Sequence, residues 1–466
     1  MAKRALIGDL EALLGAGKVL TEPEDRAAYS YDAAVVKPVL PLAVVRPETE
    51  EELGKVVAYC HRQGIPLTVR GAGTNLSGGT VPHEKGIVIL TGKLDKIVEL
   101  NPEDMYAVVQ PGVITANFAK AVEKEGLFYP PDPGSQAVST LGGNVAENAG
   151  GLRGLKYGVT RDYVLGLEFF SAEGDLIRTG SRTVKCVSGY NLAGLLVGSE
   201  GTLGVISRII LRLIPYPAAK KSMMALFSDL RSASETVAAI IAARVIPATL
   251  EFMDRFTIDA VERFSRAGLP GDIEAMLLIE VDGHPAQVKD EAEKVEKICR
   301  DCGALKVRVA ENEEERNRVW EARRSALSAL AKLRPTVVLE DATVPRSKIP
   351  EMVQAIQDIA QEYKVQIGTF GHAGDGNLHP TILTDRRNHD EWRRVEGAVE
   401  AIFEAALKLG GTLSGEHGIG IAKAPFLHKE VGRGSIEYSR RIKRALDSRN
   451  ILNPGKILWL EGSGGE

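Results

Sequence analysis

Glycine-rich stretches occur three times within one β-rich region, and they restrict the possible folds of this chain more than any other feature. They are residues 70–79 (RGAGTNLSGG), 130–151 (PPDPGSQAVSTLGGNVAENAGG) and 198–206 (GSEGTLGVI). Clustered glycine indicates a backbone that adopts positive φ or approaches another group closely. The second stretch has almost no large side chain, so we expect it to contribute little to a core. Together the three stretches predict an extended, phosphate-bearing cofactor lying across this region.

The first stretch is not a Rossmann crossover, although it superficially matches the dinucleotide fingerprint G-x-G-x-x-G. Leu76 occupies the third glycine position, and a further turn and the strand GIVIL follow where a helix is required. Successive backbone N–H groups of such a loop can still form an anion-binding concavity for a pyrophosphate. In the second stretch Ser135, Thr140 and Asn144 offer side-chain hydrogen bonds to the same ligand.

Length and composition are those of an ordinary globular protein with more than one domain. A chain of 466 residues exceeds what one hydrophobic core usually organises. Its net charge of -4 implies no broad basic field and argues against nucleic acid as a partner. Four cysteines are too few for a disulfide framework, and the lone C-x-x-C of Cys299 and Cys302 favours a structural interpretation. No stretch approaches the ~20 apolar residues of a membrane span, so we expect a protein that is not transmembrane.

The pattern of helices and strands predicts an α+β protein with four segments. They are an N-terminal helical segment (1–36), a β-rich region with intervening helices (37–217), a helix-rich α+β region (218–430) and a C-terminal segment (431–466). Pro215 and Pro217 follow a long β-branched run and suggest the main boundary. Predicted helices are 49–63, 115–125, 232–244, 286–300, 312–332 and 389–409.

Histidine and glutamate residues in two polar, glycine-rich segments suggest a metal site. His372 and His379 lie in GHAGDGNLHP, and Glu416 lies in SGEHGIG. Two imidazoles and one carboxylate suit Zn²⁺, Fe²⁺ or Mn²⁺. Sequence separation does not show whether these side chains converge, so scattered hydrogen-bonding roles are an equally good interpretation.

Four motifs, RGAGTNLSGG, PDPGSQAVSTLGGNVAENAGG, KYGVTRDYVLGLE and GSEGTLGVI, resemble the FAD-binding domain of the vanillyl-alcohol-oxidase type flavoproteins. The resemblance is to the branch that contains D-lactate dehydrogenase, D-2-hydroxyglutarate dehydrogenase and the flavin-binding subunit of glycolate oxidase, and it covers residues 40–457. It implies an α+β fold with a two-part FAD-binding domain (37–217) and an α+β cap or substrate domain (218–430). It also implies that the C-terminal helical segment (431–466) returns to complete the flavin site.

The resemblance implies that FAD lies against the glycine-rich stretches. We expect non-covalent FAD because the loop 70–79 has neither His nor Cys, and His83 lies just outside it. The residues implied to contact FAD are Arg70, Gly71, Gly73, Thr74, Asn75, Leu76, Ser77, Gly78, Pro131, Asp132, Gly134, Ser135, Thr140, Gly142, Gly143, Asn144, Asn148, Gly150, Gly151, Tyr157, Glu200, Gly201, Gly204, Val205, Ile206 and Asn453.

The same resemblance assigns roles to the histidine and glutamate residues. It implies that His372, His379 and Glu416 coordinate a divalent metal and that His417 acts as the base. Of the adjacent Arg323 and Arg324 only one can face the site. The family pattern favours Arg323 for the substrate carboxylate, whereas the alternative is an exposed helix arginine. Weaker suggestions are Thr343 in the same pocket, Lys456 near the flavin, and supporting roles for Asp375 and Asn377.

The implied activity is FAD-dependent oxidation of a small D-2-hydroxy acid, most simply lactate or glycolate, with hydride transfer to flavin N5. Electrons then pass to an external acceptor, such as a quinone, a cytochrome, an electron-transferring flavoprotein or an iron–sulfur subunit. We expect a cytoplasmic protein, peripheral at the inner membrane only through a partner, and compatible with a homodimer. The alternatives are an FAD-binding accessory subunit, a 2-hydroxyglutarate-type substrate, a metal-dependent hydrolase and a non-redox synthase of the same fold.

Overall fold

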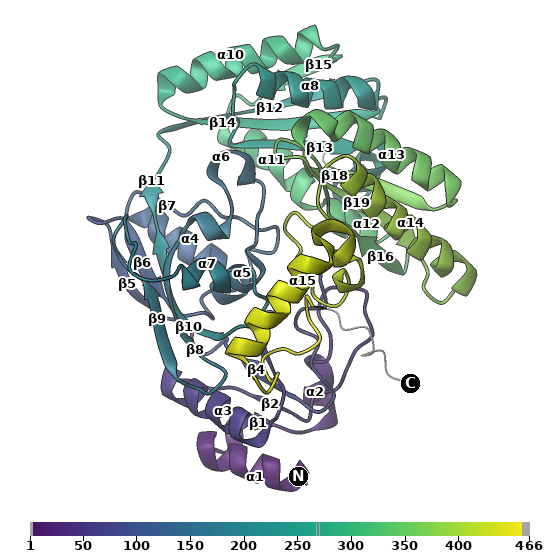
Figure 1. The fold of residues 1–466 in the computed structure, drawn as a ribbon. Coiled ribbons are helices and arrows are strands. Elements are labelled where there is room, and N and C mark those ends of the chain that lie inside the picture. Colours follow the sequence, from purple (N-terminus) through teal and green to yellow (C-terminus); the bar gives the residue numbers. More distant parts are fainter. Residues whose placement is uncertain (1–2, 267, 270, 459–466) are drawn as a thin grey trace. The chain divides into compact units, whose positions relative to one another are not determined.

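The computed structural model describes residues 3–458 except residues 267 and 270, and the chain forms two compact units (Figure 1). The first unit comprises Met1–Gly150, Val159–Tyr216 and Glu416–Glu466, and the second comprises Gly151–Gly158 and Pro217–Gly415. The main break thus lies beside Pro217. The chain returns to the first unit at Glu416, ahead of residue 431, and a short excursion at Gly151–Gly158 joins the second unit.

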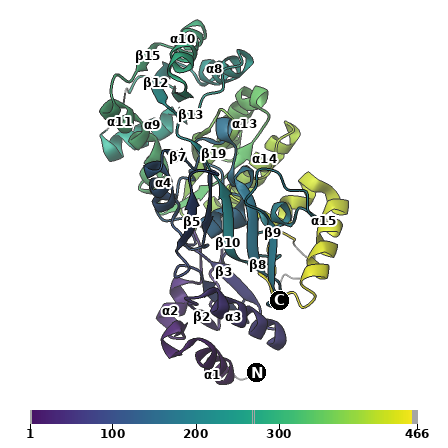
Figure 2. The same cartoon turned by 90° about the vertical axis from the view of Figure 1, so that its left-hand side faces the viewer.

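The first sheet of the first unit is small and mostly parallel. Its strands run in the order β1 (Val19–Leu20), β2 (Ala43–Val45), β4 (Ile87–Leu90) and β3 (Leu67–Arg70). Helix α3 (Glu50–Gln63) begins at Thr49, whose side chain accepts a hydrogen bond from the Glu52 N–H. It ends at Gly64, which has a φ of 66°. Helix α1 (Lys3–Leu14) packs against α3, and both contribute to one hydrophobic core (Figure 2).

The N-terminal 36 residues are less helical than predicted. Helix α1 and helix α2 (Pro23–Ala28) are separated by β1, and residues 29–36 are irregular. Asp32 explains the difference, because its carboxylate accepts hydrogen bonds from the Ala34 N–H and from the side chain of Asn75. A short polar side chain that bonds nearby backbone in this way stabilises a turn in place of a helix.

The second sheet of the first unit is antiparallel and carries the later glycine-rich stretches. Its strands run in the order β5 (Ile97–Asn101), β6 (Tyr106–Val109), β10 (Val205–Arg212), β8 (Val164–Phe170) and β9 (Leu176–Gly180). The other elements of this unit are α4 (Thr115–Lys124), β7 (Leu127–Phe128) paired with β11 (Ile214–Pro215), α5 (Leu141–Glu147), α7 (Leu192–Leu196) and α15 (Leu427–Leu446).

Helix α5 contradicts the expectation that the second glycine-rich stretch contributes little to a core. Leu141 and Val145 are buried in the same cluster as residues of β6, β8 and β10. The small neighbours make this possible, since a methyl group on Gly142 would lie 2.5 Å from Cβ of Pro111. Glycine therefore lets the helix approach the adjacent chain closely enough to bury its two large residues.

The second unit is built on one large antiparallel sheet. Its strands run in the order β15 (Lys306–Val309), β12 (Ala219–Phe227), β14 (Ala275–Gly283), β13 (Thr249–Asp254), β18 (Gln366–His372), β19 (Asn377–Thr384) and β16 (Thr336–Leu339), with β17 (Ala342–Thr343) paired to β19. Helices α8 (Leu230–Ala242), α10 (Pro285–Asp301), α13 (Ile349–Glu362) and α14 (His389–Lys408) share one core with the sheet. Helices α9 (Arg255–Ser265), α11 (Glu313–Arg324) and α12 (Ala326–Ala331) share a second core.

The predicted helix 312–332 is divided into α11 and α12 at Ser325.

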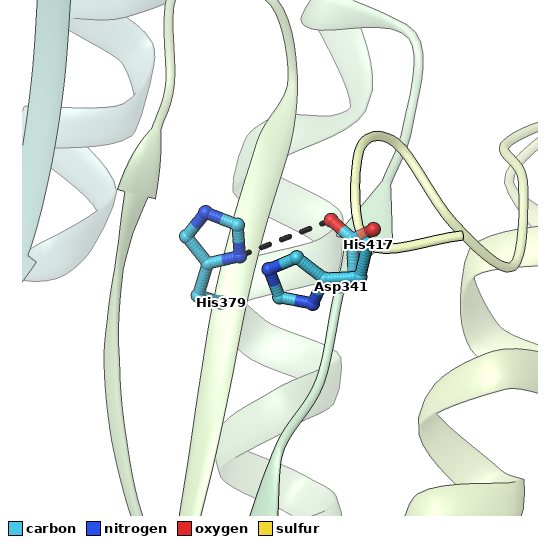
Figure 3. Close-up of side chains that lie close together, drawn as sticks. All are labelled: Asp341, His379 and His417. Carbon is cyan, nitrogen blue, oxygen red and sulfur yellow. Dashed lines mark ion pairs between the residues drawn. The ribbon is translucent and has the colours of Figure 1, made fainter. Parts of the chain in front are cut away.

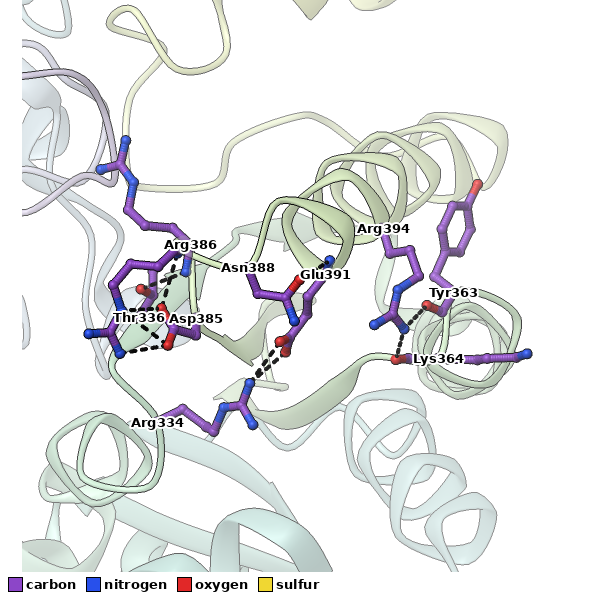
Figure 4. Close-up of polar contacts among 10 residues, drawn as sticks. Arg334, Thr336, Tyr363, Lys364, Asp385, Arg386, Asn388, Glu391 and Arg394 are labelled. Carbon is purple, nitrogen blue, oxygen red and sulfur yellow. Dashed lines mark hydrogen bonds and ion pairs between the residues drawn. The ribbon is translucent and has the colours of Figure 1, made fainter.

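Polar side-chain contacts hold helix α14 in its place within the second unit. Helix α14 begins at Asn388, whose side chain accepts from the Glu391 N–H, and the Glu391 carboxylate receives two hydrogen bonds from Arg334 (Figure 4). Arg394 on α14 donates to the backbone oxygens of Tyr363 and Lys364 at the end of α13. The contacts of Arg394 hold α14 beside α13, and the contact of Arg334 holds the first turn of α14 beside the segment before β16.

Within the described part of the chain, no helix combines the length and the apolar character that crossing a membrane requires.

Candidate active site

The three glycine-rich stretches come together in the first unit. The Gly198 N–H donates to the Val145 carbonyl at 2.9 Å, and the Glu200 N–H donates to the Ala146 carbonyl at 2.8 Å. A methyl group on Gly71 would lie 2.2 Å from Oγ1 of Thr140. Loop 70–79, helix α5 and the turn before β10 therefore form one backbone-lined region, as the sequence suggested for a cofactor cradle.

Asn453 joins two of these stretches to the C-terminal segment. Its Nδ2 donates to the carbonyl oxygens of Gly79 at 2.8 Å and Glu200 at 2.7 Å. Its Oδ1 accepts from the Thr68 hydroxyl at 3.0 Å. The side chain is buried, so all three bonds lie out of water. Asn453, predicted as a cofactor residue, is thus placed to hold the cradle together.

Arg70 and Asp32 support the first glycine-rich loop. The buried Arg70 guanidinium donates to the Tyr31 carbonyl and lies over the Tyr29 ring at 5.7 Å. Burial lowers the pKa of Arg70 and raises the pKa of Asp32. Gly73, with a φ of 70°, packs directly on the guanidinium. Sequence reasoning missed Asp32, because nothing in the surrounding residues distinguishes it from a surface acid.

Two carboxyl groups, those of the half-buried Glu147 and the buried Glu200, lie within the same region. Both oxygens of Glu200 accept backbone hydrogen bonds, from Ile419 at 2.7 Å and from Gly420 at 2.8 Å. Burial raises the pKa of Glu200 to about 7, and burial together with the charge of Glu200 raises the pKa of Glu147 well above its usual value. Burial lowers the pKa of Lys456 to about 8, against the attraction of Glu200. The region formed by the three glycine-rich stretches therefore carries less negative charge at neutral pH than the number of its acidic residues suggests.

The other predicted FAD contacts are distributed over both units. Those in the first unit are Thr74, Leu76, Ser77, Gly78, Pro131, Asp132, Gly134, Ser135, Gly143, Asn144, Asn148, Gly201, Gly204, Val205 and Ile206. Gly151 and Tyr157 belong to the second unit, in the excursion that includes helix α6 (Gly154–Tyr157). The Tyr157 hydroxyl donates to the buried carboxylate of Asp282 at 2.8 Å, and Lys156 Nζ donates to the other oxygen at 2.6 Å.

His372 and His379 lie together in the second unit, on the hairpin formed by β18 and β19. His372 pairs with Asn377 and Phe370 pairs with His379, so the alternation of strand side chains places both histidines on one face. Their ring centroids are 5.1 Å apart, with the ring planes at 88°. The turn needs glycine at position 376, where φ is 90° and a methyl group would lie 2.0 Å from the Val344 carbonyl oxygen.

Glu251, which sequence reasoning missed, links His372 to Arg323. Oε1 of Glu251 is 2.7 Å from Nδ1 of His372. Oε2 accepts from Arg323 Nε at 2.7 Å and Nη2 at 2.6 Å. Glu251 is 0% exposed and Arg323 is 6% exposed, whereas Arg324 is exposed. Of the two adjacent arginines, Arg323 is therefore the inward-facing one, in line with the family pattern.

The Asp341 carboxylate lies near Nδ1 of His379, as that of Glu251 lies near Nδ1 of His372, but at a longer distance. Figure 3 shows its carboxylate directed at His379 Nδ1, 3.8 Å away. Asp341 also accepts from Asn377 Nδ2 and from the Ser414 hydroxyl, and Asn377 donates to Thr343 as well. Asn377, for which a supporting role is predicted, thus contacts Asp341 and Thr343. Asp341 itself was not singled out from the sequence.

Glu416 and His417 lie in the first unit, where its last segment begins. The Glu416 carboxylate lies beside Gly150, where a methyl group would be 2.7 Å from Oε2. Gly150, predicted as an FAD contact, therefore also leaves room for Glu416. The structure thus groups the two histidines with Glu251 and Arg323 in the second unit, and Glu416 with the glycine-rich stretches in the first.

Two protein-family models match the chain. The model for the C-terminal domain of FAD linked oxidases matches residues 216–457, and the model for an FAD binding domain matches residues 41–180.

Individual proteins are similar over nearly the whole chain. The glycolate oxidase subunit GlcD of Bacillus subtilis is 53% identical, over 93% of this chain and 92% of its own. The D-lactate dehydrogenase of Anaerostipes hadrus is 34% identical, over 95% of each chain. Among solved structures, p-cresol methylhydroxylase has a TM-score of 0.81 at 19% identity, covering 98% of this chain and 96% of its own. At that identity the structural likeness shows the fold alone.

Proposed function

The chain belongs to the FAD-linked oxidases, and from this premise we propose that it is a dehydrogenase that oxidises a small D-2-hydroxy acid to the 2-oxo acid. As a member it is an FAD-dependent oxidoreductase. The names of its relatives, glycolate oxidase subunit and D-lactate dehydrogenase, support a 2-hydroxy acid as the substrate. The observation that carries the proposal is the buried group of His372, Glu251 and Arg323, which joins a potential metal ligand to a cation suited to a carboxylate.

FAD, which we expect to be held without a covalent bond, would supply when bound the acceptor for the hydride that leaves Cα of the substrate. Loop 70–79 would hold the pyrophosphate through its backbone N–H groups, since successive N–H groups form an anion-binding concavity. Helix α5 and the turn around Gly201 would provide the remaining wall. The close approaches at Gly71 and Gly142 suit this role, because a side chain at either position would collide with Thr140 or Pro111 and push the walls apart.

A divalent metal, zinc, iron or manganese, fits the donors that the chain offers. Nδ1 of His372 contacts Glu251, so Nε2 would be the ligand atom, the usual arrangement for a metal-binding histidine. We propose His379 and Glu416 as the other ligands. When bound, such a metal would supply a positive charge that favours the deprotonated form of the substrate hydroxyl.

Arg323 and His417 would then handle the charge and the proton of the substrate. Arginine has five N–H donors, and Glu251 uses two of those of Arg323, so others can bind a substrate carboxylate. His417 would accept the hydroxyl proton at Nδ1 or Nε2, for which an imidazole pKa near 6.5 is suitable at neutral pH.

Electrons must leave the reduced flavin for an external acceptor. The sequence contains no recognisable iron–sulfur cysteine motif, since only Cys299 and Cys302 are close in sequence. The word subunit in the name of the Bacillus subtilis relative supports a partner protein as the acceptor. An iron–sulfur subunit, an electron-transferring flavoprotein or a quinone would serve.

The test is anaerobic reduction of the bound flavin by a panel of D- and L-2-hydroxy acids. We expect bleaching by D-lactate or glycolate, loss of bleaching after chelation, and retention of FAD in both states. The His417→Asn variant should keep its FAD and its metal yet lose flavin reduction. Full-speed reduction in that variant would refute the base assignment. A flavin that no 2-hydroxy acid bleaches would favour an accessory subunit instead.

A further inference from the structure

Glu251 contacts two residues to which the proposed function gives separate tasks. We propose that Glu251 is a positioning residue that orients the metal ligand His372 and the substrate-binding Arg323 with one carboxylate. This inference rests on the proposed function and adds a residue to it. It predicts that metal binding and carboxylate binding depend on the same buried side chain.

The sheet explains why Glu251 reaches His372. Strand β13 pairs with β18 through Phe252 and Gly371, so Glu251 and His372 lie next to that pair and point to the same face. The carboxylate is completely buried within the sheet. An ionised carboxylate in such surroundings is stable only with strong partners, and His372 and Arg323 supply them.

The contact with His372 selects one tautomer of its ring. A carboxylate oxygen 2.7 Å from Nδ1 favours a proton on that nitrogen and leaves the lone pair on Nε2. The ring is also held edge-on to His379. Without Glu251 the ring could rotate or carry its proton on Nε2, and either change would remove a metal ligand.

The contact with Arg323 fixes the plane of the guanidinium. Nε and Nη2 both donate to one oxygen of Glu251, and the group lies over the Phe370 ring at 4.8 Å from its centroid. Anchored on one edge and on one face, the guanidinium can present its remaining N–H donors in a single direction only. A fixed fork of this kind matches a carboxylate better than a mobile one does.

The two partners use different oxygens, and this makes the proposal testable. His372 contacts Oε1 and Arg323 contacts Oε2. Glutamine at this position has nearly the same shape but offers one acceptor oxygen, and its NH₂ group would face an N–H of the other partner. Glu251→Gln must therefore weaken the contact with His372, the contact with Arg323 or both, while it changes the volume of the buried side chain very little.

The experiment compares three FAD-loaded proteins: the wild type, Glu251→Gln and the control Glu391→Gln. Glu391 is also a glutamate that accepts two hydrogen bonds from one arginine, here Arg334 at 2.7 and 2.9 Å. Arg334 comes just before β16, whose Thr336 pairs with Thr384 at the end of β19 remote from His379. The control therefore tests the loss of a glutamate–arginine contact in the same unit, away from the histidines.

Metal-free protein is titrated with Zn²⁺ and with Mn²⁺, and oxalate is titrated against the flavin absorption spectrum. We expect Glu251→Gln to bind metal roughly 10–100-fold more weakly, the usual effect of losing a ligand's carboxylate partner. We also expect weaker oxalate binding by this variant. The control should match the wild type in both titrations.

The outcomes separate this inference from the function on which it rests. A wild-type protein that binds no metal would overturn the proposed metal site and the inference with it. Equal metal and oxalate affinities in the wild type and Glu251→Gln would overturn the inference alone. Where the variant does not fold, ¹⁵N spectra of histidine-labelled wild type decide the question. A His372 ring protonated at Nδ1 supports the proposal, and one protonated at Nε2 refutes it.

Discussion

Glu251 on β13 and Arg323 at the end of α11 form a buried ion pair, with Oε2 of the glutamate 2.6 Å from Nη2 of the arginine. The pair lies 72 residues apart in sequence. Buried pairs of this kind contribute little net stability compared with apolar residues, but breaking one leaves an uncompensated charge in the interior. Its presence on the face that carries both histidines suits the positioning role proposed for Glu251.

Removing only the glutamate of this pair should destabilise the protein strongly. Glu251→Ala leaves the Arg323 guanidinium buried beside Phe370 without its carboxylate, and we expect a loss of about 3–5 kcal/mol in the free energy of unfolding. Urea denaturation at neutral pH measures this loss. The double variant Glu251→Ala/Arg323→Met should recover part of it, because the unpaired charge is gone. A loss below about 1 kcal/mol would show that Arg323 finds another partner.

Asn453 should determine how tightly FAD is retained, although its side chain is engaged by protein atoms. Asn453→Ala removes the bonds to Gly79 and Glu200, each worth about 1–3 kcal/mol when a buried group is left unsatisfied. We expect FAD affinity to fall by at least ~10-fold, measured by flavin fluorescence during titration.

Thr68→Val is the matched control for this prediction, since it removes only the hydrogen bond to Asn453 Oδ1. It should weaken FAD binding much less than Asn453→Ala does. Equal effects of the two variants would indicate general damage to the first unit.

Glu147 and Glu200 in the first unit should make stability fall as pH rises. The pKa of Glu147 and that of Glu200 are both raised in the folded state, to about 7 for Glu200. Between the ordinary carboxyl pKa and these raised values the folded chain binds more protons than the unfolded chain, so unfolding becomes easier with increasing pH. Glu147→Gln removes one of the two carboxyl groups whose pKa folding raises, so the free energy of unfolding should fall less steeply with pH in this variant than in the wild type between about pH 5 and 7.5.

Denaturation in a fixed excess of FAD at several pH values checks this prediction. The exposed Glu84→Gln is a suitable control, because its side chain is 70% exposed and should leave the pH dependence unchanged. Parallel pH profiles of the wild type and Glu147→Gln would show that Glu147 is ionised in the folded protein.

Part of this arrangement was predictable from sequence, because several clustered glycines, such as Gly71 and Gly142, mark close approaches of the backbone. The predicted FAD-binding family and its glycolate oxidase and D-lactate dehydrogenase branch are confirmed by the family models and by the similar proteins, and the solved structures confirm the α+β fold. Histidines in a glycine-rich turn also drew attention to the hairpin that carries His372 and His379. These signals are local, and each can be recognised within a stretch of 22 residues or fewer.

What could not be predicted depends on contacts between distant segments. Glu251 lies in the strand sequence TLEFMD, where an acid looks like an ordinary solvent-facing residue. Only the pairing of β13 with β18 and the fold of α11 reveal its partners. The break at Ser325 has no proline or glycine to announce it, and residues 29–36 leave the predicted helix because Asp32 bonds to Asn75 in another loop.

The last prediction concerns Tyr157, which the family resemblance implies as an FAD contact. In the structure its hydroxyl donates to Asp282, whose carboxylate also holds Lys156. Tyr157→Phe should therefore destabilise the protein by about 1.5 kcal/mol, the lower end for a hydrogen bond to a charged group, and leave FAD affinity unchanged. Lys156→Met, which leaves the buried Asp282 without its cation, should cost more, about 2–3 kcal/mol. Thermal denaturation and an FAD titration of both variants test these two expectations. A large loss of FAD affinity in Tyr157→Phe alone would show that the Tyr157 hydroxyl contacts the cofactor.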